Sequence, residues 1–170
     1  MKSGVSRVII LVGHGGVPRD FSRDKVRRLM QLEGQRQAHA LPVGEEEAAL
    51  DRELRDHPRT PETDPYKFGL EQLAAALRMR LGAPLQVAYN EFCAPSVPDA
   101  VDGAVAQGAR EVVLVSSMMT PGGSHSEEEI PELVRELRKK HHEVSIRYAW
   151  PFDMRALAGF MVEHLARFDV

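Results

Sequence analysis

Three side chains that can ligate a metal each follow a short apolar run of the sequence: His14, Glu91 and His125. His14 stands among glycines, in Gly-His-Gly-Gly, and His125 is preceded by Pro-Gly-Gly-Ser. Glycine lets the backbone turn sharply and leaves a neighbouring imidazole uncrowded. Two imidazoles and a carboxylate form a borderline donor set, which suits Fe, Co, Ni or Zn better than the oxygen-preferring Mg or Ca. The sequence therefore predicts that these residues bind a divalent metal, with Glu91 as a third ligand or as a proton acceptor.

Each of these features also fits a plainer role when it is taken alone. His14 can be incidental to a glycine-rich turn, although a phosphate loop is disfavoured because the lysine that usually follows is missing. Glu91 can be a surface carboxylate that pairs with an arginine. The acidic run 127–129 suits the first turn of a helix, where it would complement the macrodipole. The metal-site hypothesis therefore depends on whether the fold brings the three residues together.

A basic segment follows the His14 loop. It contains Arg19, Arg23, Lys25, Arg27 and Arg28. Arginine binds carboxylates and phosphates in a bidentate manner, so Arg19 and Arg23 are candidates to hold an anionic ligand. The alternative is a solvated helix face that is balanced by nearby aspartates.

The elements that must position these residues are predicted from apolar periodicity. Continuous β-branched runs at 8–12 and 112–115 are typical of strands covered on both faces. More alternating runs at 85–89 and 144–148 are expected nearer the edges of the sheet. Helical spacing of apolar residues predicts four helices, at 64–81, 97–107, 130–141 and 156–168.

Alternation of strands and helices predicts an α/β fold with a central parallel sheet of about four strands and helices on both faces. In such sheets ligands bind outside the carboxyl ends of the strands. His14, Glu91 and His125 each follow one of three successive strands, so we expect them to converge along one rim.

The segment 18–63 does not fit a simple strand-to-helix connection. It is rich in charge and proline, and it has room for two short helices near 23–37 and 45–56. About 45 residues are too few for an unstapled independent core. We therefore expect a helical insertion over or beside the active edge, within a single domain that spans residues 1–170.

Composition excludes several other classes of function. The formal net charge of −3 argues against nucleic acid as the main partner, because phosphate binding usually needs a basic face. Cys93 is the only cysteine, which excludes an internal disulfide and fits a reducing compartment. No apolar stretch is long enough for a signal-peptide core or a membrane span. These properties predict a cytoplasmic protein without a membrane partner.

The motifs, taken in order, resemble the small class II chelatases that act on sirohydrochlorin in cobalamin or sirohaem synthesis. The matching segments are Leu-Val-Gly-His-Gly at 11–15, Glu-Phe-Cys-Ala-Pro-Ser at 91–96, Gly-Ala-Arg-Glu-Val-Val-Leu-Val at 108–115, and Pro-Gly-Gly-Ser-His-Ser-Glu-Glu-Glu-Ile-Pro at 121–131. The resemblance covers residues 5–16 and roughly 65–168. The family's metal-binding histidines would fall on His14 and His125, and its glutamate on Glu91.

The resemblance implies a chelatase-like three-layer fold and the insertion of Co²⁺ or Fe²⁺ into a tetrapyrrole, with Ni²⁺ or Zn²⁺ also compatible with the ligands. The metal would be a substrate, and no organic cofactor is expected. Short members of the family pair as homodimers, so a homodimer is expected here. The alternative is a carrier of the same fold that binds metal or tetrapyrrole without turnover. A phosphoryl-transfer enzyme using His14 ranks third, because glycines stand where arginines usually hold the phosphate.

Overall fold

The computed structural model describes residues 7–168. The sequence predicts no targeting segment at the N-terminus, and residues 1–6, on which part of that prediction rests, lie outside the described residues. Four parallel strands form the sheet: β1 (Arg7–Gly13), β2 (Leu85–Tyr89), β3 (Glu111–Ser116) and β4 (Ser145–Tyr148). Their order is β2-β1-β3-β4. The two continuous apolar runs are thus the central strands, and the two alternating runs are the edges, as the sequence predicts.

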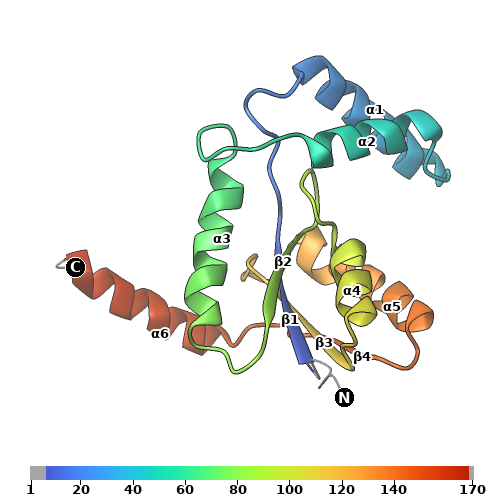
Figure 1. Cartoon of the computed structure of the whole chain (residues 1–170). Helices are drawn as coiled ribbons and strands as arrows, with labels where there is room; N and C mark the ends of the chain where they lie inside the picture. The colour runs from blue at the N-terminus through green and yellow to red at the C-terminus, as the bar shows by residue number, and fades with distance from the viewer. Residues whose placement is uncertain (1–6, 169–170) are drawn as a thin grey trace.

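Helices cover both faces of this sheet (Figure 1). On one face, α4 (Val97–Ala106) and α5 (Ile130–Lys140) bury the larger apolar cluster against alternate residues of β1 and β3. On the other face, α3 (Pro65–Arg78) packs over β1 and β2 through a smaller cluster that includes the buried Cys93. Because side chains alternate along a strand, β1 sends Ile10 to the first cluster and Leu11 to the second. The predicted three-layer α/β fold is confirmed.

The strand register aligns the carboxyl ends of β1, β2 and β3. Val12 of β1 is level with Ala88 of β2 and with Ser116 of β3. The chain therefore leaves all three strands at one edge of the sheet, where the predicted ligands begin.

The two predicted helices of the insertion are present as α1 (Arg23–His39) and α2 (Glu45–Asp56). They lie beyond the carboxyl edge of the sheet, at the top of Figure 1. Their small apolar core consists of Phe21, Leu29 and Leu54, and Phe92 from the loop after β2 packs against it. The insertion is thereby attached to one of the loops that carry the candidate ligands.

The last helix, α6 (Met154–Leu165), continues into a 3₁₀ turn at Ala166–Phe168. It extends away from the sheet instead of lying against it (Figure 1), and none of its residues is buried. Within residues 7–168, no helix is long and apolar enough to cross a membrane.

Candidate metal site

The loop after β1 is held against the loop after β2 by backbone hydrogen bonds. Asn90 N–H donates to the Gly13 carbonyl and Glu91 N–H donates to the His14 carbonyl, each at 2.8 Å. Gly15 has φ +97°, and a Cβ at this position would lie 1.9 Å from the Glu91 carbonyl oxygen. Only glycine allows this close approach, which places His14 beside Glu91.

His125 begins a single turn of π-helix, His125–Glu129, directly before α5. The Ile130 N–H donates to the His125 carbonyl, five residues back. This wider turn brings Glu129 Oε2 to 2.9 Å from Nδ1 of His125. The acidic run predicted to start a helix therefore also supplies a partner for the histidine.

The three predicted ligands meet at the carboxyl edge of the sheet. His14, Glu91 and His125 each offer one ligand atom, and these atoms lie within 4.8 Å of one another. His14 Nε2 is 3.7 Å from Glu91 Oε2, and the two imidazole centroids are 4.7 Å apart. All three residues are partly buried. The spacing and the donor set fit one divalent ion held by two imidazoles and a carboxylate.

Both imidazoles have an acceptor at Nδ1. The Gly15 carbonyl oxygen lies 2.8 Å from Nδ1 of His14. The Glu129 carboxylate is the corresponding acceptor at Nδ1 of His125, at 2.9 Å. The same carboxylate accepts a hydrogen bond from Asn90 Nδ2 at 2.8 Å. Carbonyl and carboxylate oxygens accept hydrogen bonds, so a proton on Nδ1 would donate to these oxygens and leave the Nε2 lone pair available for a metal, while Asn90 Nδ2 also lies 3.1 Å from Nδ1 of His125.

The charge of Glu129 is maintained by these contacts. Burial acts to raise its pKa, but the hydrogen bonds with His125 and Asn90 outweigh burial and leave the pKa below its usual value. An ionised carboxylate behind a ligating histidine orients the ring and increases its basicity. The contacts of Asn90 and Glu129 with His125 were not predicted from the sequence, although the four-residue spacing of His125 and Glu129 is compatible with a contact within one helical turn.

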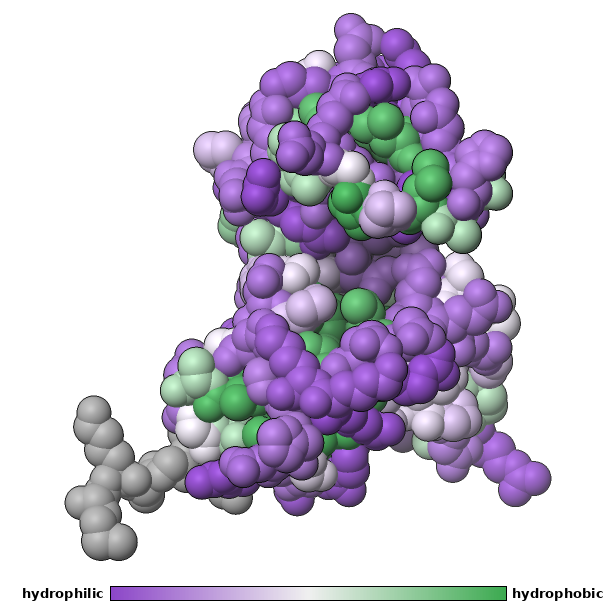
Figure 2. Space-filling view, turned by 90° about the vertical axis from the view of Figure 1, so that its right-hand side faces the viewer, coloured by the Kyte–Doolittle hydropathy of each residue, from purple (hydrophilic) through white to green (hydrophobic). Residues whose placement is uncertain are grey.

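A cavity of about 750 Å³ opens beside Glu91, between the insertion and the start of α5. Figure 2 shows this hollow between the upper lobe formed by the insertion and the body below it. The lining is strongly charged: Glu33, Arg36, Gln37, Arg55, Asn90, Glu91, Glu127, Glu128, Glu129, Glu132, Leu133 and Arg135. Burial, with a further contribution from Glu91, raises the pKa of Glu33. Glutamates outnumber arginines here, so the cavity favours the approach of cations.

The predicted anion-binding residues lie elsewhere on the insertion. Arg19 is exposed and donates to the Glu62 carbonyl, while Arg23 is the exposed first residue of α1. Neither lines the cavity beside Glu91, which takes its arginines from α1, α2 and α5. Their role in binding an anionic ligand stays a prediction.

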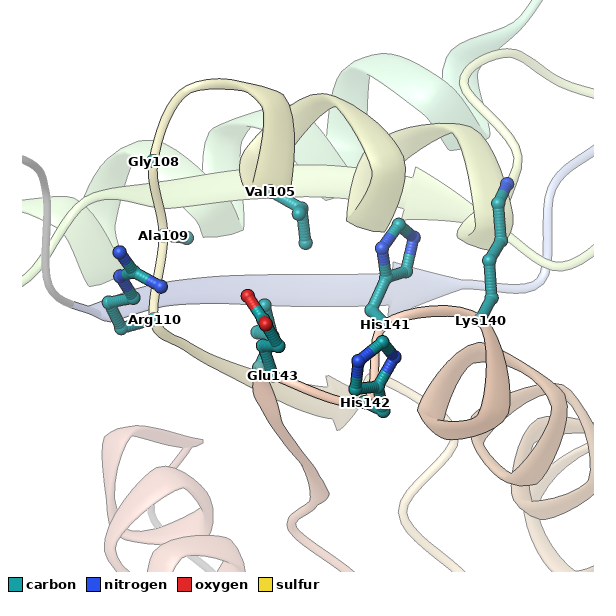
Figure 3. Close-up of a pocket in the computed structure, with 9 residues that line it drawn as sticks. Val105, Gly108, Ala109, Arg110, Lys140, His141, His142 and Glu143 are labelled. Carbon is teal, nitrogen blue, oxygen red and sulfur yellow. The ribbon is translucent and has the colours of Figure 1, made fainter.

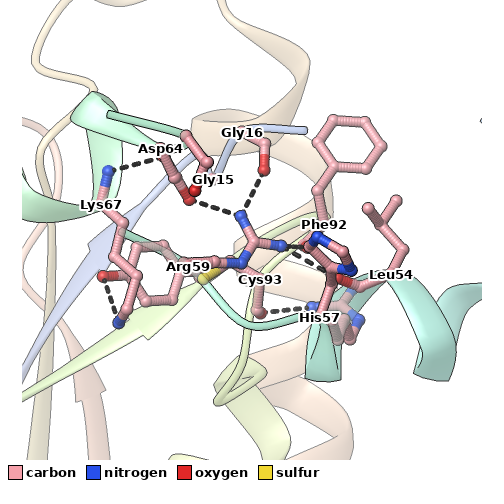
Figure 4. Close-up of polar contacts among 12 residues, drawn as sticks. Gly15, Gly16, Leu54, His57, Arg59, Asp64, Lys67, Phe92 and Cys93 are labelled. Carbon is pink, nitrogen blue, oxygen red and sulfur yellow. Dashed lines mark hydrogen bonds and ion pairs between the residues drawn. The ribbon is translucent and has the colours of Figure 1, made fainter. Parts of the chain in front are cut away.

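Arg59 was not predicted as a functional residue, but it connects the insertion to the loops that carry His14 and Glu91 (Figure 4). Its guanidinium donates to the carbonyls of Gly16 and Phe92 and to the Asp64 carboxylate. It also donates to the Leu54 carbonyl at the end of α2, at 3.0 Å. Its side chain is only 4% exposed. An arginine between two prolines of a charged segment gave no signal that it would be buried.

Arg55 holds the loop after β2 from the same side. It donates to the carbonyls of Asn90 and Cys93, at 3.3 and 3.0 Å, and pairs with Asp51. Burial raises the pKa of the Cys93 thiol, which fits the expected buried apolar role and not a thiolate ligand. The insertion thus positions the loop that carries Glu91.

A second pocket, of about 340 Å³, lies at the opposite, amino-terminal edge of the sheet (Figure 3). It is lined by His141 and His142 at the end of α5 and by Arg110 before β3. His141 Nε2 pairs with Asp102 at 2.6 Å. These histidines lie at the opposite end of the strands from His14, Glu91 and His125 and are not part of the candidate metal site.

Similarity to known proteins assigns the chain to a family. The CbiX family model matches residues 63–165, more than half of the chain, including Glu91 and His125. The chain belongs to the CbiX family. The resemblance predicted from the motifs is confirmed. The matched region begins at residue 63, so it does not include His14 or most of the insertion.

Individual relatives agree with this assignment. The chain is 34% identical over 70 residues to a sirohydrochlorin cobaltochelatase of Priestia megaterium, which is 41% of this chain and 22% of the relative. It therefore spans about a fifth of the length of that relative. A CbiX protein of Marinobacter aquaeolei VT8, assigned to cobalamin (vitamin B12) biosynthesis, matches with a TM-score of 0.54 and 20% identity, over 95% of this chain and 98% of that chain. This similarity supports the fold.

A looser structural similarity extends to the sirohydrochlorin chelatase SirB of Bacillus subtilis subspecies spizizenii, whose structure contains cobalt. Here the TM-score is 0.46 and the identity 15%, over 86% of this chain and 43% of that chain.

Proposed function

We propose that this protein is a chelatase that inserts Co²⁺ or Fe²⁺ into sirohydrochlorin or a related tetrapyrrole. One observation carries the proposal: three ligand atoms of His14, Glu91 and His125 lie within 4.8 Å of one another beside a cavity of about 750 Å³. Cavities of this size accommodate large organic ligands. Membership of the CbiX family and the named activity of the Priestia megaterium relative support the choice of substrate.

Metal insertion makes three demands on the site. A divalent ion must be held and partly desolvated, the macrocycle must bend towards it, and two pyrrole protons must leave. In this proposal the Nε2 atoms of His14 and His125 deliver the metal. Glu91 acts as a third ligand or accepts a pyrrole proton, since its carboxylate lies 3.7 Å from His14 Nε2.

The charged lining of the cavity would serve both substrates. The glutamates concentrate divalent cations near the ligands. Arg36 donates its Nε–H to Glu47, and a guanidinium has four further N–H donors with which to bind a substrate carboxylate. Arg135 lines the same cavity. Arg19 and Arg23 remain candidates to bind substrate carboxylates that extend beyond the cavity.

The donor set also accepts Ni²⁺ and Zn²⁺, and the reaction requires no organic cofactor. We further propose that residues 1–170 act as one domain, with 18–63 as an insertion, and that the chain works in the cytoplasm as a homodimer. The single buried cysteine fits a reducing compartment.

The direct test is an absorbance assay of purified protein with sirohydrochlorin and Co²⁺ or Fe²⁺. We expect metal insertion with multiple turnovers, and loss of that rate in the His14→Ala/His125→Ala double variant. His142→Ala, which changes an exposed histidine at the other end of the sheet, is the matched control. A double-variant rate equal to that of the unmodified protein would overturn the proposal.

The same experiment tests the carrier hypothesis. A carrier would bind metal or tetrapyrrole stoichiometrically and show no turnover beyond one equivalent. That result would support the metal site but contradict the proposal that the protein is an enzyme.

A further inference from the structure

Every polar atom of His14 except Nε2 has a close polar partner within residues 7–168. The His14 N–H donates to the Tyr66 hydroxyl oxygen at 2.8 Å, and the His14 carbonyl accepts from the Glu91 N–H, also at 2.8 Å. Nδ1 lies 2.8 Å from the Gly15 carbonyl oxygen. Tyr66 is therefore the one side chain in this part of the protein that holds the backbone of His14.

The end of β1 explains why the His14 N–H needs a side chain. The pairing of β1 with β3 ends at Val12, and its pairing with β2 ends at Gly13. The next N–H lies beyond both ladders, and no backbone acceptor for it occurs among the described residues. A backbone N–H that leaves a sheet is satisfied by water or by a side chain. The Tyr66 hydroxyl, which can accept one hydrogen bond while it keeps its own proton, supplies this acceptor.

The start of α3 lies close enough to the loop after β1 for this contact. A Cβ on Gly13 would lie 2.3 Å from Leu70 Cδ2 and 3.1 Å from the Tyr66 hydroxyl oxygen, so glycine permits the close approach of the helix. Asp64 caps α3 with its side chain and is also the buried partner of Arg59. The first turn of α3 is thereby fixed to the end of the insertion, and Tyr66 with it.

From these contacts we infer that Tyr66 is a positioning residue of the metal site, which fixes the backbone of His14 so that Nε2 stays directed at the other ligands. Its hydroxyl acts from the α3 face of the sheet, whereas Glu129 contacts His125 from the start of α5, on the opposite face. The two imidazoles are thus held from opposite sides. The inference rests on the metal site of the proposed function but not on tetrapyrrole chemistry, so a protein that binds Co²⁺ without turnover still tests it.

The hydroxyl makes the specific contact, whereas the ring of Tyr66 is 40% exposed and α3 packs on the sheet through buried residues such as Leu70. Tyr89 provides a comparison on the same helix. Its hydroxyl lies 3.4 Å from Lys67 Nζ and 3.5 Å from Glu71 Oε1, both on α3. Removing the Tyr89 hydroxyl therefore weakens contacts of α3 without removing a hydrogen bond of the His14 loop.

The first test is Co²⁺ binding by isothermal titration. Tyr66→Phe keeps the ring and removes only the acceptor, so we expect the affinity to fall about tenfold, as is typical when a ligating histidine loses an outer partner. The visible absorption of the bound Co²⁺, which depends on the geometry of its ligands, should change as well. Tyr89→Phe is the matched control and should leave both the affinity and the spectrum unchanged.

The outcomes separate a positioning role from a structural one. An unchanged affinity or an unchanged spectrum in Tyr66→Phe would overturn the inference, even in a less stable variant, since His14 would then reach the metal in the same way without the hydroxyl. An equal loss in Tyr89→Phe would overturn it too, because a general loosening of α3 would explain both. Absence of Co²⁺ binding in the unmodified protein would reject the metal site and this inference together, whereas binding without turnover would reject only the enzyme.

The second test measures the contact itself, without metal, as hydrogen exchange of the His14 amide by NMR. The amide should be protected in the unmodified protein and in Tyr89→Phe, and the protection should be lost in Tyr66→Phe. A His14 amide that stays equally protected in Tyr66→Phe would contradict the inference, because another group would then accept its hydrogen bond.

Discussion

Arg59 and Asp64 form an ion pair that is almost completely withdrawn from water, with side chains 4% and 2% exposed. The same guanidinium donates to the Gly16 carbonyl in the loop after β1 and to the Phe92 carbonyl in the loop after β2. Phe92 has φ +59°, a conformation that is uncommon for a residue other than glycine. The insertion therefore fixes the two loops that carry His14 and Glu91.

Arg59→Met should destabilise the protein and weaken metal binding together. It leaves the Asp64 carboxylate buried without its charge partner, a change that typically costs about 3–5 kcal/mol. Urea unfolding measures the stability, and Co²⁺ titration of the fraction that remains folded measures the affinity. Arg52→Met, at an exposed position of α2, is the control and should change neither.

Arg59→Lys separates charge from geometry. Lysine keeps a positive charge but cannot reproduce the planar fork that reaches several acceptors at once. We expect partial recovery of stability with little recovery of Co²⁺ affinity. Full recovery of both would show that charge alone is sufficient and that the two loops do not need to be bridged.

Glu129→Gln should lower the affinity for Co²⁺ by about 10–100-fold, the usual effect of removing a carboxylate behind a ligating histidine. The variant keeps the shape of the side chain but loses the negative charge that lies 2.9 Å from Nδ1 of His125. Isothermal titration with Co²⁺ measures the affinity. Glu136→Gln removes a charge from an exposed i,i+3 pair on α5 and should leave the affinity unchanged. Equal affinities for the two variants would mean that Glu129 does not orient His125.

Gly15→Ala should disrupt the metal site through the backbone. Its Cβ would meet the Glu91 carbonyl oxygen at 1.9 Å, and φ +97° is strained for any residue with a Cβ. The two loops must separate, so we expect Co²⁺ affinity to fall at least about tenfold, the effect typical of a disturbed ligand shell. Gly34→Ala is the control, because Gly34 lies in the exposed interior of α1 with nothing within 4 Å of the new Cβ. There alanine should stabilise the helix by up to about 1 kcal/mol. A Gly15→Ala variant with unchanged affinity would contradict the close contact between the loops.

The sequence was sufficient to predict the sheet, its helices and the convergence of the three candidate ligands, because each of these follows from apolar periodicity and from the carboxyl-edge rule for parallel strands. It could not reveal Arg59, because the burial of an arginine depends on carbonyl groups that are distant along the chain, at Gly16 and Phe92. The helix predicted at 156–168 was found, but its apolar periodicity gave no sign that it would extend away from the sheet. Local pattern determines that such a helix forms, whereas the connection at Trp150 and Phe152 determines where it goes.

Asp102→Asn should remove a pH-dependent part of the stability. The hydrogen bond from Lys140 lowers the pKa of Asp102, with a further contribution from His141, and outweighs the opposing effect of burial. An unfolded aspartate has a pKa of about 3.9, so the lowered value in the folded protein stabilises it fully above about pH 4. This stabilisation is lost as the pH falls through the folded pKa. The unmodified protein should therefore exceed the variant in stability at pH 7, by less than about 1 kcal/mol because the pair is partly exposed.

The difference should shrink in acid, and urea unfolding at pH 7 and near pH 3 measures it. Asp24→Asn is the control, since the Asp24 carboxylate is 87% exposed in its pair with Arg27 and should contribute little at either pH. A difference between Asp102→Asn and the unmodified protein that grows as the pH falls would reverse the sign expected from a lowered pKa. It would mean that the Asp102 carboxyl is more stable in its protonated form in the folded protein, and that the contacts with Lys140 and His141 do not hold it ionised at the end of α5.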